Sequence, residues 1–263
     1  MNHQHMPAIF LGHGSPMNAI EDNAYTEAWS ALGRRFPNPR AIVMVSAHWM
    51  THTTAVTAMA QPKTIHDFGG FPPALYEMQY PAPGSPALAQ QVADLLTSSG
   101  VTQQVALDQA WGLDHGTWSV LAKVYPAANI PVIQLSLNMN EEAPYHFAIG
   151  QQLAQLREQG VMIMASGNVV HNLRALNPQI KAYDWARRFD DLVRDTIVAG
   201  DFDKLIAFDT LGQDARYSIP TAEHFLPLLY ILGAKGTDDS TEVICHDTAM
   251  GSISMTSYIF HRA

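Results

Sequence analysis

The chain has 263 residues, of which 47% are hydrophobic, and its formal net charge is −9. This length suits one α/β domain, and an excess of 24 acidic over 15 basic residues argues against a surface that binds nucleic acid phosphates. The single cysteine excludes an internal disulfide and a thiolate-rich metal cage, and no apolar run approaches the roughly 20 residues that span a membrane. We therefore predict one domain over residues 1–263 with a flexible tail at 1–6. It should be a cytoplasmic monomer or small homo-oligomer with no nucleic acid or membrane partner.

Apolar runs alternate with helical patterns along the chain, interrupted at 51–86 by a segment rich in proline, glycine and aromatic residues that is typical of a binding loop. In chain order, we predict a strand at 7–11, a helix at 21–36, a strand at 41–46, a helix at 86–98, a short helix ending near Tyr125, a strand at 130–135, a helix at 141–159, a strand at 161–166, helices at 184–199 and 221–232, and strands at 242–245 and 252–260. Pro227 is expected to kink its helix, and Cys245 to lie in the core. This alternation favours an α/β fold with a largely parallel central sheet and helices on both faces.

Three histidines follow predicted strands closely. His13, held between two glycines, lies two residues past the first strand, His48 two past the second, and His171 about five past the strand at 161–166. In parallel α/β sheets, ligands bind outside the carboxyl ends of the strands. We therefore expect these three side chains to share one site at that edge of the sheet.

Two further histidines are candidates for the same site. His115 follows Asp114, which is also suited to cap the next helix, and His224 lies in the first turn of a predicted helix, where the positive dipole end favours a neutral imidazole. Glu223 and His224 point about 100° apart on a helix, so only one faces the site well, and spacing leaves open which one. His66 lies in an aromatic loop that could close over a substrate. Solvated positions are expected for His52, His146, His246 and His261, and tail positions for His3 and His5.

The chemistry of these side chains points to a metal. A site rich in histidine and free of cysteine suits zinc or non-haem iron. More histidines gather there than a structural metal needs, which indicates acid–base work beside the metal.

Six ordered motifs carry a family resemblance: Gly12-His13-Gly14-Ser15-Pro16, Ser46-Ala47-His48-Trp49, Ile65-His66-Asp67-Phe68, Asp114-His115-Gly116, Ser166-Gly167-Asn168-Val169-Val170-His171-Asn172 and Glu223-His224-Phe225-Leu226-Pro227-Leu228. Together they resemble the class III extradiol ring-cleavage dioxygenases of the 4,5-DOPA type. The resemblance runs from about residue 7 to the C-terminus.

The resemblance implies a catalytic domain that inserts O₂ into a small catechol such as DOPA. Its 4,5-cleavage product, seco-DOPA, cyclises to betalamic acid. The implied metal is Fe(II), with Zn(II) as another occupant, and the implied ligands are His13, His48 and His224, although Glu223 is the alternative to His224.

The resemblance also assigns the remaining site residues. His171 would be the general base and would reach the metal when no substrate is bound, His115 would be a second acid–base residue, and His66 and Phe68 would contact the substrate. Two other functions stay open from the sequence: a zinc-dependent hydrolase with Glu223 or His171 as base, and a metal-binding protein without turnover.

Overall fold

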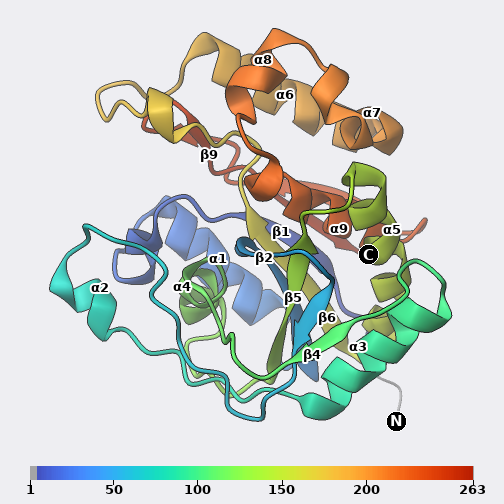
Figure 1. Ribbon diagram of the computed structural model, residues 1–263. Helices are drawn as coiled ribbons and strands as arrows, with labels where there is room; N and C mark the ends of the chain where they lie inside the picture. The colour runs from blue at the N-terminus through green and yellow to red at the C-terminus, as the bar shows by residue number, and fades with distance from the viewer. Residues whose placement is uncertain (1–4, 263) are drawn as a thin grey trace.

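An eight-stranded mixed sheet runs through the centre of the molecule (Figure 1). The computed structural model describes residues 5–262. The strand order is β4-β3-β5-β2-β6-β1-β10-β7, and the pairs β1–β6, β2–β6, β2–β5 and β3–β4 are parallel. The strands are β1 (Ala8–Gly12), β2 (Ala41–Thr51), β3 (Ala55–Thr57), β4 (Ala106–Asp108), β5 (Val132–Asn138), β6 (Val161–Gly167), β7 (Ser240–Ile244) and β10 (Ser257–His261), with a small hairpin of β8 (Thr248–Ala249) and β9 (Ile253–Ser254).

Both faces of the sheet are covered by helices, which is why the inner strands β1, β2 and β6 begin as continuous apolar runs. In β2, Ile42 and Met44 belong to a core shared with helices α1 (Ala24–Arg35) and α4 (His115–Val124). Val43 and Val45 belong to a core shared with α5 (Ala143–Leu153) and α9 (Leu226–Ala234). The predicted α/β fold with a largely parallel sheet is therefore confirmed. The helices are α1 (Ala24–Arg35), α2 (Pro73–Glu77), α3 (Pro86–Ser98), α4 (His115–Val124), α5 (Ala143–Leu153), α6 (Asp184–Ala199), α7 (Phe202–Ile206), α8 (Gln213–Ser218) and α9 (Leu226–Ala234).

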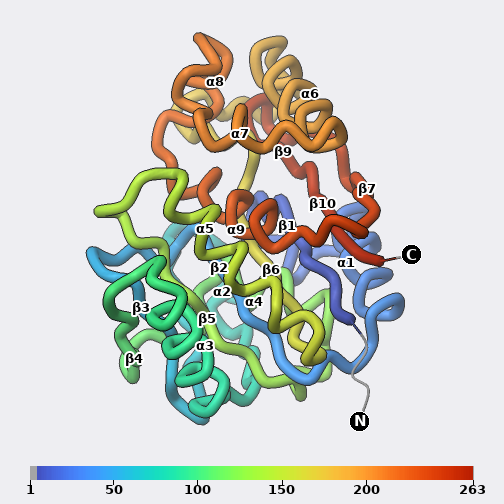
Figure 2. Tube along the Cα trace, turned by 90° about the vertical axis from the view of Figure 1, so that its right-hand side faces the viewer, coloured from blue at the N-terminus to red at the C-terminus, as the bar shows by residue number. Residues whose placement is uncertain are grey.

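Short 3₁₀ helices complete the helical segments. They are η1 (Pro16–Ala19), η2 (Ala154–Gln159), η3 (Leu173–Ala175), η4 (Phe208–Thr210) and η5 (Ala222–His224). Helices α6, α7 and α8 gather at one end of the molecule, beyond the sheet, in both views (Figures 1 and 2). Within residues 5–262, no helix has the length and apolar character needed to cross a membrane.

The helix predicted at 221–232 is two elements. Residues 222–224 form η5, and α9 begins at Leu226 with proline in its first turn. Proline is tolerated at this position because the first backbone N–H groups of a helix have no partner within it. Pro227 therefore starts a helix, and the predicted kink is wrong.

Three predictions about burial are also wrong. Met6, assigned to the flexible tail, is 4% exposed, and its backbone N–H donates to the Arg157 carbonyl at 3.1 Å. His146, expected in solvent, is fully buried with Nδ1 2.9 Å from the Tyr230 hydroxyl. Cys245, expected in the core, is only partly buried and has a φ of 53°. His3 and the tail residues 1–4 lie outside the described residues.

Candidate active site

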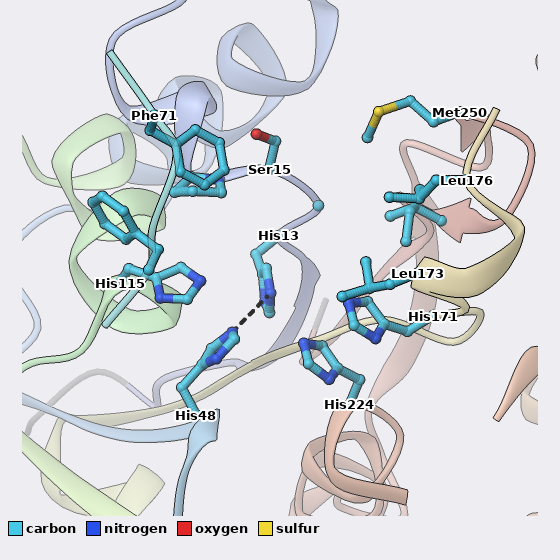
Figure 3. A pocket seen from close by; sticks show the side chains of 14 residues that line it. His13, Ser15, His48, Phe71, His115, His171, Leu173, Leu176, His224 and Met250 are labelled. Atoms are coloured by element: carbon cyan, nitrogen blue, oxygen red, sulfur yellow. Dashed lines mark hydrogen bonds between the residues drawn. The ribbon is translucent and has the colours of Figure 1, made fainter. Parts of the chain in front are cut away.

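Five histidines meet in one cavity of about 260 Å³ (Figure 3). His13 follows β1, His48 lies near the end of β2, His115 begins α4, His171 follows β6, and His224 ends η5. The structure thus brings the three strand-end histidines together with the two further candidates. They come from five separate segments of the chain that converge at one end of the sheet.

Glycines allow these segments to approach one another. Gly14 has a φ of +61°, a conformation that suits glycine, and this turns the chain directly after His13. A Cβ at Gly116 would collide with the Ser46 hydroxyl and lie 2.8 Å from a ring carbon of His48. Glycine at position 116 therefore lets the start of α4 pack against β2 and His48.

His13, His48 and His224 form a nearly equilateral group. Their ring centres lie 5.2 Å (His13–His48), 5.4 Å (His13–His224) and 5.0 Å (His48–His224) apart. Imidazoles that bind one ion at about 2.1 Å place their ring centres about 5 Å apart. The Nε2 atoms of His13 and His48 are 3.3 Å apart, and Nε2 of His224 is buried and has no hydrogen-bond partner in the part of the chain that the structure describes. These nitrogens fit a metal ion.

Two sets of ligand atoms in this cluster lie close enough together for a metal. One set is His13, His48 and His115, and the other is His171, Glu223 and His224; within each, the ligand atoms lie within 4.8 Å of one another. His171 stacks on His224 with ring centres 3.4 Å apart and nearly parallel planes. The cluster therefore contains a histidine group that could hold a metal.

Burial keeps these imidazoles neutral. Desolvation, strengthened by neighbouring imidazoles, lowers the pKa values of His13 and His224 well below their usual range. Desolvation is likewise the largest cause that lowers the pKa of His48 to about 3 and that of His171 to about 4. Only neutral imidazole can bind a metal, so at neutral pH the donor set is ready for one.

An oxygen atom faces the Nδ1 atom of each of the three grouped histidines. The Ser166 hydroxyl is 2.7 Å from Nδ1 of His13, a Glu223 carboxylate oxygen 3.1 Å from Nδ1 of His224, and a carboxylate oxygen of Asp67 3.7 Å from Nδ1 of His48. Partners at the second ring nitrogen fix the orientation of metal-bound histidines. The Glu223 carboxylate can only accept, so it favours a proton on Nδ1 of His224 and leaves Nε2 free to bind. The Ser166 hydroxyl is able to accept from Nδ1 of His13, and Asp67 lies beyond hydrogen-bonding distance of His48.

The family described as the catalytic LigB subunit of aromatic ring-opening dioxygenase matches residues 2–261. The chain belongs to this family. It is 50% identical over 262 residues to a protein of Escherichia coli K12 named 4,5-DOPA dioxygenase extradiol, covering 98% of this chain and 95% of that relative. A Beta vulgaris protein of the same name is 37% identical, over 96% of this chain and 95% of its own length.

A solved structure supports the same fold. A crystal structure of an uncharacterized protein from Escherichia coli K12 matches with a TM-score of 0.84 and 44% identity, covering 97% of this chain and all of that one. The resemblance inferred from the motifs is confirmed, and this LigB-family chain is an extradiol aromatic ring-opening dioxygenase. Membership favours that function over the zinc-dependent hydrolase and the binding protein.

Some of the other predicted site residues of this dioxygenase line the cavity and others lie outside it. Phe68 lines the cavity, with its ring centre 5.4 Å from that of His115. His66 is not among the residues that line the cavity in the described part of the chain, and its Nε2 atom is 2.9 Å from the Met78 carbonyl oxygen. Asp114 caps α4 as expected, accepting from the Thr117 N–H at 3.1 Å. Of the adjacent pair on η5, His224 lines the cavity and Glu223 lies against its Nδ1.

Sequence reasoning missed several residues around the cavity. Asp67 contacts His115, and the walls include Phe71, Leu173, Leu176 and Met250. Asp67 lies between His66 and Phe68, the two predicted substrate contacts, so its place in that motif could have identified it as a site residue. The two leucines and Met250 carry no such signal, because an apolar side chain in a loop has no chemistry that marks it.

Proposed function

We propose that this dioxygenase cleaves a small catechol, for which DOPA is the representative substrate, at a metal held by His13, His48 and His224. The observation that carries the proposal is the nearly equilateral group of three neutral imidazoles on the floor of an aromatic-lined cavity. The metal proposed for turnover is Fe(II), with Zn(II) as an inactive occupant. Bound iron would supply a redox centre that passes electron density from the catechol oxygens to O₂, whereas zinc has no accessible redox change.

The two remaining histidines divide the acid–base work in this proposal. His171 is neutral at pH 7, because burial lowers its pKa to about 4, so its ring can accept the proton of a catechol hydroxyl. His115, on the other side of the cavity, would first accept a proton at the ring nitrogen that faces the cavity and then return it to the oxygen on which negative charge develops. His171 would also reach the metal before substrate enters, as its stacking on His224 suggests.

The cavity walls would hold the ring of the catechol. Phe71 lies on one side and Leu173 and Leu176 on the other (Figure 3), and the ring of Phe68, which also lines the cavity, lies 5.3 Å from that of Phe71. Such surfaces bind a planar apolar ring and exclude water from the reacting atoms. Cleavage of DOPA between carbons 4 and 5 would then give seco-DOPA, which cyclises to betalamic acid.

The test is oxygen consumption. The protein is purified without air, loaded with Fe(II) and mixed with DOPA or protocatechuate, and we expect O₂ uptake together with a yellow ring-opened product. The zinc-loaded protein serves as the control and should consume no O₂. Absence of turnover across a panel of catechols would refute the proposed substrate class, and hydrolysis of esters or amides by the zinc form would support a hydrolase instead.

A further inference from the structure

Asp67 joins the long aromatic loop to the start of α4. It lies between His66 and Phe68 in the predicted binding loop, and its side chain is 19% exposed. One carboxylate oxygen, Oδ1, accepts the backbone N–H of His115 at 2.8 Å. The other, Oδ2, lies 2.9 Å from Nδ1 of the same residue.

The two contacts differ in quality. The backbone N–H makes a hydrogen bond to Oδ1, whereas Nδ1 of His115 has no aligned hydrogen-bond partner among residues 5–262 in spite of its short distance to Oδ2. In enzymes without bound substrate, catalytic hydrogen bonds are often poorly aligned and become aligned once the substrate binds. The distance to Oδ2 already lies within hydrogen-bonding range, so alignment of the N–H with the carboxylate, and not proximity, is what this bond lacks.

We propose that Asp67 is the positioning residue that fixes the tautomer and orientation of His115. A carboxylate only accepts hydrogen bonds, so the nitrogen of His115 that faces it must carry the proton. Nδ1 is then the protonated nitrogen, and Nε2 is the atom presented to the cavity that His115 lines. This positioning role of Asp67 goes beyond the proposed function. Only its kinetic test rests on the proposed acid–base role of His115.

Both carboxylate oxygens of Asp67 contact His115, so the substitution Asp67→Asn has a predictable effect on the tautomer of that residue. The backbone N–H of His115 needs an acceptor, so the amide oxygen of the substituted side chain should occupy the place of Oδ1, and its NH₂ group then faces Nδ1. Nδ1 must become the acceptor, which moves the ring proton to Nε2. The substitution keeps the size of the side chain and reverses the tautomer of its partner.

The contact between Asp67 and His115 also affects the neighbouring residue Phe68. Phe68, the next residue, packs edge-on against the His115 ring and lines the cavity. Asp67 therefore ties the aromatic surface that meets the substrate to the histidine that acts on it. Asp67 thus acts on two features of the site: which nitrogen of His115 carries the proton, and where Phe68 lies in the cavity wall.

The first experiment reads the tautomer directly. The full chain is labelled with ¹⁵N-histidine, loaded with Zn(II) and studied by long-range ¹H–¹⁵N correlation spectra, with the His115 signals assigned from their loss in His115→Ala. We expect the proton on Nδ1 in the wild type and on Nε2 in Asp67→Asn. The control Asp238→Asn removes one negative charge at an exposed position and should leave the tautomer unchanged. A proton on Nε2 in the wild type, or an unchanged tautomer in Asp67→Asn, overturns the proposal.

The second experiment is a double-mutant cycle with the Fe(II)-loaded enzyme. Asp67→Asn should lower kcat at least about tenfold with little change in KM, within the roughly 10²–10⁴-fold range of general acid–base catalysis. In the His115→Ala background the same change should cost less than about twofold, because the two residues act as one unit. An equal loss in both backgrounds overturns the proposal. If no catechol turns over, the proposed function fails, while the spectra still decide the role of Asp67.

Discussion

The two walls of the cavity are held in different ways. The aromatic wall, formed by Phe68, Phe71 and His115, is interlocked: the ring of Phe68 lies 5.3 Å from Phe71 and 6.1 Å from Trp118, and the indole N–H of Trp118 donates to the Ile65 carbonyl at 2.8 Å. The leucine wall, formed by His171, Leu173, Leu176, Met250 and Ile253, depends on backbone hydrogen bonds such as His171 N–H to the Ser218 carbonyl at 2.8 Å.

Exposure separates the two walls further. Leu173 is 60% exposed and Leu176 is 40% exposed, so these side chains gain little from burial in the protein alone. Phe68 and Phe71 are partly buried and contact other rings. The aromatic wall is thus built before substrate arrives, whereas the leucine wall contributes most of its apolar contact when a ligand is present.

The largest effect is expected for the proposed metal ligands His13, His48 and His224, which lie between the two walls. His48→Ala should weaken Zn(II) binding at least about 100-fold, because loss of residues that merely orient ligands already costs about 10–100-fold. Competition with a chelator measures the affinity, and exposed His52→Ala is the control. Unchanged affinity in His224→Ala together with loss in His115→Ala would move the third ligand to the aromatic wall, since His13, His48 and His115 also lie within metal-binding distance.

The second effect concerns His171, the proposed general base, on the leucine wall. His171→Gln should lower kcat by about 10²–10⁴-fold, the usual contribution of a general base, while Fe(II) content stays within about twofold. Steady-state O₂ uptake and metal analysis measure the two quantities. Loss of iron equal to that in His48→Ala would make His171 a required ligand and not a base.

The pH dependence of stability should also distinguish the walls. Burial lowers the pKa of His171 to about 4, so its contribution to stability is complete above pH 6.5 and is lost as the pH falls from 6.5 to 4. At pH 5 this amounts to at most about 2 kcal/mol, which His171→Asn should remove from the difference between pH 7 and pH 5. Urea unfolding of the metal-free protein measures it.

Asp67, on the aromatic side, provides the contrast. Burial acts to raise its pKa, but the nearby imidazole and the backbone N–H of His115 lower it overall below 3.8. Its contribution is therefore complete above pH 3.8 and is lost only below that value. Asp67→Asn should leave the difference between pH 7 and pH 5 unchanged, and a change as large as that in His171→Asn would contradict this contrast.

The smallest effect is expected for Leu176→Ala. An exposed side chain contributes within about 0.5 kcal/mol to the free energy of unfolding, so this variant should fold normally and raise KM a few-fold. Phe68→Ala, which removes packing against several rings, should lower stability by more than about 1 kcal/mol. Thermal unfolding and substrate titration test both variants, and equal stability losses would remove the distinction between the walls.

Much of this arrangement follows from local patterns. The continuous apolar runs of β1, β2 and β6 identify strands buried on both faces, and His13, His48 and His171 follow from their places near the strand ends. The boundaries of α3 and α6 agree with the predicted ranges because a proline start and a regular apolar face are local signals. The short strands β3 and β4 have no such signal, since three residues become a strand only through pairing.

The sequence by itself determined the fold class, the family and the histidines near the sheet edge, because apolar periodicity and glycine turns act over a few residues. Only the tertiary structure decided that His224 and not Glu223 lines the cavity, that His146 is buried against Tyr230, and that Asp67 faces His115. These outcomes depend on contacts between residues 48 or more positions apart, or on which side of a short helical turn faces the cavity. Spacing along the chain cannot specify such contacts, since they exist only once the segments have packed together.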